Sequence, residues 1–303
     1  MNVGLRLTAW IGAGAVLSAA TASSFPSLVS QSTGDDFGAL FVAIPIVALL
    51  TLIFALRWRE FVKAIEAEMK NEPVVRVLGL AMIGLLLAVK PFTSQSLAAS
   101  GVAVVLTFYG AALAVIPASG RFILPYAAVY AAAAGAPAVL LWAFGEPLAG
   151  VSSALSAKMA ALAGFPLTWQ GTQFAFISKT GEVVSGSVTP GCSSISSVTI
   201  FIGLLALMQL DLKKDIRSTL KLAGVGVLAL MLLNSLRILI LLWVGYEYGS
   251  SALWGLHDWL GYAIFLGFFL AILPVYARMK GPMERTAGAP GTTWPSSDQE
   301  PRL

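Results

Sequence analysis

Hydrophobic residues recur along this chain in long stretches that are separated by short polar segments. Eight stretches have the length that crosses a bilayer, because a helix of about 20 residues rises about 30 Å. Their approximate limits are 5–23, 38–56, 76–94, 97–117, 122–144, 193–211, 219–244 and 255–277. This pattern predicts an all-α polytopic membrane protein with about eight transmembrane helices.

The first stretch admits two interpretations. Arg6 precedes an apolar run that ends in the small residues Ala19, Ala20 and Ala22, as in a cleaved signal peptide. The run is long for a signal core, so we favour a retained helix over 5–23.

Residues 57–75 have an amphipathic pattern instead of a continuous apolar one. Phe61, Val62, Ile65 and Met69 fall on one side of a helix there. The pattern predicts a helix that lies on the cytoplasmic membrane surface with its apolar side in the lipid.

The longest segment between two apolar stretches is 145–191. It begins with an expected interfacial helix over 147–163. Apolar and polar residues then alternate on both sides of a turn at 179–181, which predicts a short β-hairpin with strands near 172–177 and 182–188.

Composition supports one membrane domain over residues 1–278, within which the chemistry-bearing region is 188–277. Only 11% of the 303 residues are charged, against about 25% in soluble domains. Residues 279–303 are rich in Pro, Gly, Ser and Thr, and we expect them to form a disordered cytoplasmic tail.

Lys and Arg residues set the expected orientation. They gather in 57–76, in 211–221 and in the tail. Eight spans with both termini in the cytoplasm place all three groups inside, as the positive-inside rule requires, and place 145–191 outside. The isoelectric point near 9.2 therefore follows from topology in a cytoplasmic membrane, and no nucleic-acid partner is expected.

The chain has one Cys and one His, which excludes an internal disulfide and a Cys-rich metal site. No metal or cofactor is expected. Cys192 follows Pro190 and Gly191 directly before a span, so its thiol is expected at a helix N-terminus on the outer side. Such a position lowers a thiol pKa, and the amides near Ser193 and Ser194 could hold an oxyanion. The alternative is a buried apolar Cys.

Arg237 lies deep in an apolar run, where it requires a partner or a water-filled cavity. Asn234 precedes it by three residues and shares its helix face. The alternative is a structural Arg that ties helices together through carbonyl groups.

His257 is expected at the start of the last span, again on the outer side, where it can act as a general acid or base. Asp258 cannot face its neighbour on a helix, so we expect an N-terminal cap or a first-turn carboxylate. The alternative is an interfacial His among Trp254 and Trp259.

Together these residues predict a site for thiol-based acyl transfer. The only Cys, the only His and the only mid-span Arg come from three successive helices and fall towards one leaflet. A thiol needs a base or cation to ionise, and an acyl-transfer site needs an oxyanion donor.

Three blocks in the last 115 residues resemble the exosortase/archaeosortase family. They are "GCSSISS", "NSLRILIL" and "HDWLGYAIF", each at its expected place in a helix. The resemblance implies a transpeptidase with Cys192 as nucleophile, Arg237 as the thiolate or oxyanion stabiliser and His257 as the general acid/base. The family's commoner block reads Cys-Ser-Gly, and this chain has Ser194 in place of that glycine.

The resemblance also implies partners. Substrates would be secreted proteins with a C-terminal sorting signal, which consists of a short motif, a hydrophobic helix and a basic tail. A membrane lipid or another cell-surface molecule would be the acceptor.

Two other classes of function compete with this interpretation. A small-solute transporter would carry paired intramembrane charges or repeats, and neither is evident. A non-enzymatic membrane assembly protein would not need Cys192. A membrane serine protease is disfavoured because G-x-S-x-G is missing from the sequence.

Overall fold

The computed structural model describes residues 3–21, 57–63, 65–66, 73–93 and 96–281. Within them the chain is mostly helical, with one small sheet. The helices are α1 (Val3–Thr21), α4 (Pro73–Ala88), α5 (Lys90–Thr93), α6 (Leu97–Val115), η1 (Pro117–Ser119), α7 (Gly120–Leu162), η2 (Pro190–Cys192), α8 (Ile195–Leu212), α9 (Ile216–Tyr248) and α10 (Ser250–Arg278). The strands are β1 (Thr168–Gln170), β2 (Gln173–Ile177) and β3 (Val183–Ser187).

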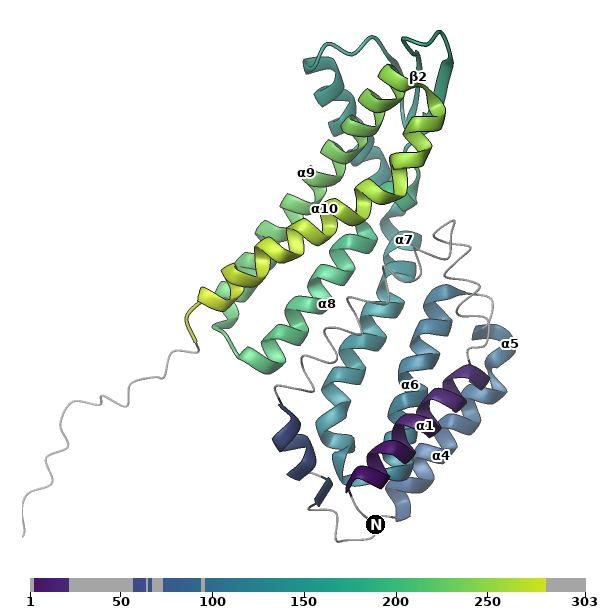
Figure 1. Ribbon diagram of the computed structural model, residues 1–303, viewed down its shortest axis with the longest axis vertical. Coiled ribbons are helices and arrows are strands. Elements are labelled where there is room, and N and C mark those ends of the chain that lie inside the picture. The colour runs from purple at the N-terminus through teal and green to yellow at the C-terminus, as the bar shows by residue number, and fades with distance from the viewer. Residues whose placement is uncertain (1–2, 22–56, 64, 67–72, 94–95, 282–303) are drawn as a thin grey trace, which may run out of the picture.

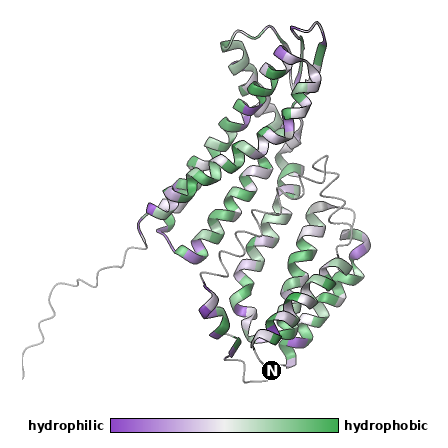
Figure 2. Cartoon of the chain, viewed as in Figure 1, coloured by the Kyte–Doolittle hydropathy of each residue, from purple (hydrophilic) through white to green (hydrophobic). Residues whose placement is uncertain are grey.

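The helices form two groups that share α7. In one group α6 contacts α1, α4 and α7, and in the other α7 contacts α8 and α9 while α9 packs along α10. Figure 1 shows the sheet at one end of the molecule, beside the junction of α9 and α10. Hydrophobic residues cover most of the helix lengths in Figure 2, and hydrophilic ones gather towards helix ends.

Five helical segments of the described residues are long and apolar enough to cross a membrane. They are Ala98–Val115, Pro117–Leu162, Ile195–Leu212, Ile216–Tyr248 and Ser250–Arg278. The stretch at 5–23 is helical as α1, 76–94 is divided between α4 and α5, and 38–56 lies outside the described residues. The all-α, multi-pass class is therefore confirmed, whereas the number of eight spans stays a prediction.

One expected boundary is wrong. The span at 122–144 and the separate helix at 147–163 are a single helix, α7, of 43 residues. Gly145, Ala149 and Ser153 are buried on one side of it. These small residues continue the packed face across Pro147, so the helix does not end there.

The amphipathic segment near residue 60 packs on protein, and the expectation that its apolar side contacts lipid is wrong. Phe61 and Ile65 are fully or almost fully buried, in a cluster with Trp10 of α1 and Ile116 after α6. Arg57 also binds Asp211 of α8, with 3.0 Å between Nε and Oδ1. A helix with one apolar side satisfies either environment, so the pattern alone does not distinguish them.

The expected hairpin is confirmed, and a third strand extends it. The sheet is antiparallel in the order β1-β2-β3, with Gln173 opposite Ser187 and Ile177 opposite Val183. One face carries the apolar side chains and packs on α9 and α10. That face contributes Phe176, Val184 and Val188 to a buried cluster with Ile238, Leu241, Leu242 and Leu253.

Polar contacts fix both ends of the α8–α10 bundle. At the sheet end, Lys179 binds Glu247 at 2.7 Å, and Glu182 accepts hydrogen bonds from the backbone and side chain of Ser250. At the opposite end, Gln209 of α8 accepts from Thr219 of α9 and from the buried Tyr276 of α10. The bundle thus holds its three helices in one register over their whole length.

Candidate active site

Cys192 is the last residue of the single-turn helix η2, and α8 begins three residues later at Ile195. The turn is closed by the Cys192 amide, which donates to Thr189 O at 2.8 Å, and by the Ser193 hydroxyl, which donates to Pro190 O at 2.5 Å. The expected start of this span at residue 193 is therefore slightly early. The sulfur precedes the membrane-spanning helix instead of lying within it.

Ser194 joins η2 to α8 in a conformation that favours glycine. Its φ is 60°, in the left-handed region, and its side chain makes no capping hydrogen bond. Ser193 and Ser194 are both buried. The glycine of the family's commoner Cys block thus falls where the backbone has a positive φ, which gives that glycine a physical reason.

Asn234 of α9 holds the cysteine turn. Its Nδ2 donates to the backbone carbonyl of Cys192 at 2.6 Å. Arg237 follows one turn later on the same helix, as the spacing of the two residues predicts. Asn234 therefore fixes the position of the sulfur relative to the guanidinium.

Arg237 reaches from α9 to α10. Its Nη2 donates to the carbonyl of His257 at 2.8 Å and lies 3.3 Å from Nε2 of the imidazole. Gly261, one turn after His257, leaves room for this contact. A Cβ at Gly261 would lie 3.2 Å from the guanidinium carbon.

His257 lies inside α10 and not at its start, because the helix begins at Ser250. Asp258 is consequently in the third turn, and the expectation of a cap or first-turn carboxylate is wrong; the N-cap is Gly249, with φ 87°. The Asp258 side chain is outside the description. Trp254 packs beside the imidazole, with 5.6 Å between ring centroids.

The surroundings of Cys192 favour its thiolate. Its pKa falls from 9.0 to about 7, chiefly because the thiol is hydrogen bonded to the His257 side chain. The hydroxyl of Thr189, 3.6 Å from the sulfur, and the charges of His257 and Arg237 act in the same direction, while burial opposes them. The turn therefore supports a nucleophile near neutral pH.

The site lies at a defined height along the helices. Arg237 is 21 residues after the start of α9, and His257 is 21 residues before the end of α10. At 1.5 Å per residue both are about 30 Å from the helix ends opposite the sheet, which is about one hydrocarbon thickness. Trp254 and Trp259 are exposed on α10 at this level, as is common at a membrane interface.

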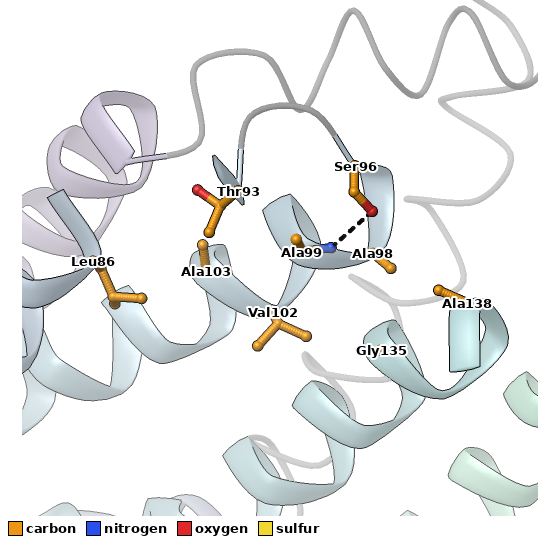
Figure 3. Close-up of a pocket in the computed structure, with 9 residues that line it drawn as sticks. All are labelled: Leu86, Thr93, Ser96, Ala98, Ala99, Val102, Ala103, Gly135 and Ala138. Atoms are coloured by element: carbon orange, nitrogen blue, oxygen red, sulfur yellow. Dashed lines mark hydrogen bonds between the residues drawn. The ribbon is translucent and has the colours of Figure 1, made fainter. Parts of the chain in front are cut away.

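A separate hollow of about 340 Å³ lies beside α6 and α7, and no residue of the site lines it (Figure 3). Its lining is mostly small and apolar: Leu86, Thr93, Ser96, Ala98, Ala99, Val102, Ala103, Gly135 and Ala138. No cluster of three or more His, Cys, Asp or Glu side chains that could hold a metal occurs in the described part of the chain.

The structure thus brings together six of the seven residues that the sequence singled out: Cys192, Ser193, Ser194, Asn234, Arg237 and His257. Two further residues were missed. Thr189 precedes the Cys by three residues, and Gly261 follows the His by four, so their spacing is the signal that could have found them.

The fold defines a multi-pass helical membrane protein with a thiol, a guanidinium and an imidazole gathered beside one end of its spans. The family of transmembrane exosortases matches residues 7–274. The chain belongs to the transmembrane exosortase family. No curated protein and no solved structure matches the chain.

Proposed function

We propose that this protein is a membrane-embedded cysteine transpeptidase that cleaves C-terminal sorting signals of secreted proteins and transfers the new carboxyl end to an acceptor. One observation carries the proposal: the only thiol of the chain interacts with His257, which also contacts Arg237. Family membership implies a membrane peptidase or transpeptidase and agrees with this chemistry.

In the first half-reaction the thiolate of Cys192 attacks the scissile carbonyl. A C–S bond forms, and the negative charge moves to the carbonyl oxygen. Arg237, together with amides at the start of α8, stabilises this oxyanion. The C–N bond then breaks, and His257 gives its proton to the departing amine, which leaves a thioester on Cys192.

In the second half-reaction an amine or hydroxyl of the acceptor attacks the thioester. His257 takes the acceptor proton, a C–N or C–O bond forms, and the C–S bond breaks to restore the Cys192 thiolate. The acceptor is a membrane lipid or another cell-surface molecule, and water gives simple hydrolysis instead.

The site is assigned to the extracytoplasmic side of the cytoplasmic membrane. The basic residues between α8 and α9 and after α10 lie at the end opposite the sheet, which the positive-inside rule assigns to the cytoplasm. A substrate would then keep its basic tail inside and its apolar helix beside the spans.

The test uses a candidate secreted protein from the same source that ends in a motif, an apolar helix and a basic tail. Wild type should shorten it at the C-terminus and form a hydroxylamine-sensitive adduct on Cys192, detected by mass spectrometry. Cys192→Ser and Cys192→Ala should abolish both while the proteins keep their thermal unfolding midpoints. Unchanged processing in these variants would remove Cys192 as nucleophile and favour a non-enzymatic or transport function.

A further inference from the structure

The third strand, β3, has one side without a neighbouring strand, because the order of the sheet is β1-β2-β3. Its register shows which peptide groups face outwards. Val188 N donates to Thr172 O and Ser178 N to Glu182 O, so these residues form the hydrogen-bonded pairs of the hairpin. Hydrogen-bonded pairs recur every second residue in an antiparallel ladder, so Val184 and Gly186 also face β2.

The peptide groups of Val183, Ser185 and Ser187 therefore point away from β2. Within the described residues these groups have no hydrogen-bond partner. The side chains of all three are exposed. An unpaired row of amides and carbonyls on an exposed strand is a ready template for another extended chain.

The strand is held in place from its other face. Val184 and Val188 are almost fully buried against α9 and α10, and the turn before β3 is fixed by Glu182 to Ser250. An added strand would meet an edge that is already ordered, so little further ordering of this protein is needed.

The edge leads directly to the candidate nucleophile. β3 ends at Ser187, and Cys192 follows five residues later, after Val188, Thr189 and the turn of η2. At about 3.3 Å per residue, a peptide paired with β3 needs only about five further residues to reach the sulfur. The proximity of edge and sulfur says what the edge is for.

We propose that the outer edge of β3 binds the extended segment of a substrate polypeptide just before its scissile bond, adding a fourth strand to the sheet. This inference rests on the proposed function, since it assigns the occupant as the substrate of Cys192. β3 runs from the sheet end towards the membrane, and the substrate must run the same way to continue into its own apolar helix. The added strand is therefore parallel to β3.

Backbone groups supply the binding energy at this edge, and side chains near it set the preference. Ser185, Gly186 and Ser187 are small, so the substrate meets little bulk on either face of the sheet. The edge favours a segment without proline at the positions whose amides it engages.

The experiment measures the binding of a short fluorescent peptide that covers the motif of a candidate secreted substrate, without its apolar helix. The protein is the full chain as Cys192→Ser in detergent, so binding is read without catalysis. Ser185→Pro in that background removes one outward amide and leaves the β2 pairing intact. It should weaken binding about tenfold, whereas the control Ser185→Ala, which keeps the amide, should leave Kd unchanged.

A second series keeps the protein unchanged, in case Ser185→Pro fails to fold. Single N-methyl groups along the peptide should weaken binding at every second residue. Wild-type affinity in Ser185→Pro, or N-methyl effects without a two-residue period, would overturn the proposal. A two-residue period together with no cleavage of the full-length substrate by wild type would leave the docking edge standing and reject the transpeptidase function.

Discussion

The ionisation of Cys192 can be measured without any substrate, because it is the only cysteine of the chain. Every alkylation event on the protein therefore reports this one thiol. With the pKa lowered from 9.0 to about 7, about half of the thiol is ionised at pH 7, against about 1% for the unperturbed group. The alkylation rate should rise with pH, reach half its plateau near pH 7 and then level off.

Replacing His257 by Ala removes the largest cause of this shift. The thiol then keeps only Thr189 and the charge of Arg237 to favour its anion, while burial continues to favour the neutral form. The midpoint should move up towards 9, and the rate at pH 7 should fall by a factor of about ten to fifty. Thr189→Val removes a weaker contact and should move the midpoint by much less.

The assay follows iodoacetamide labelling of the detergent-solubilised protein by mass spectrometry between about pH 5 and about pH 10. The midpoint is the informative quantity, because a thiolate of lower pKa is also intrinsically less nucleophilic. A wild-type midpoint near 9, or a midpoint that His257→Ala leaves in place, would refute the interaction between sulfur and imidazole as the cause of activation.

Two further variants test the packing around the site. Gly261→Ala should displace the Arg237 guanidinium, raise the Cys192 alkylation midpoint and reduce substrate processing about tenfold, whereas Gly255→Ala on the same helix, whose added Cβ would meet nothing within 4 Å, should behave as wild type; equal effects of the two would show that helix propensity, and not room for Arg237, is responsible. Ser194→Gly should stabilise the protein by up to about 1 kcal/mol, because the left-handed conformation strains serine and the larger entropy loss of glycine offsets only part of the gain. Ser193→Gly, at φ −88°, should destabilise it instead, and thermal unfolding in detergent compares the two.

The sequence predicts much of the site because the relevant signals are local. Long apolar runs define α8, α9 and α10, and strict alternation defines β2 and β3. Three successive helices place Cys192, Arg237 and His257 near one end of the bundle, and mid-span Arg requires a partner there. A chain of neighbouring helices leaves little freedom for these residues to be far apart.

Other features depend on partners that a local pattern does not specify. Small residues carry α7 past Pro147, although Gly145 and Pro147 read as a break between two helices. The amphipathic side at Phe61 suits lipid and protein equally well. The start of α10 was missed because Ser250 and Ser251 look like loop residues, and this shifted the expected place of Asp258.

The equal 21-residue spacings in α9 and α10 make the site a ruler. Its depth is fixed by the lengths of two rigid helices, so under the proposed function a peptide bond is presented only when the substrate's own span ends at the matching height. Each residue inserted between motif and span would carry the bond away by up to about 3.3 Å. Selection among secreted proteins would then depend on how far a motif lies from the hydrocarbon edge as much as on its letters.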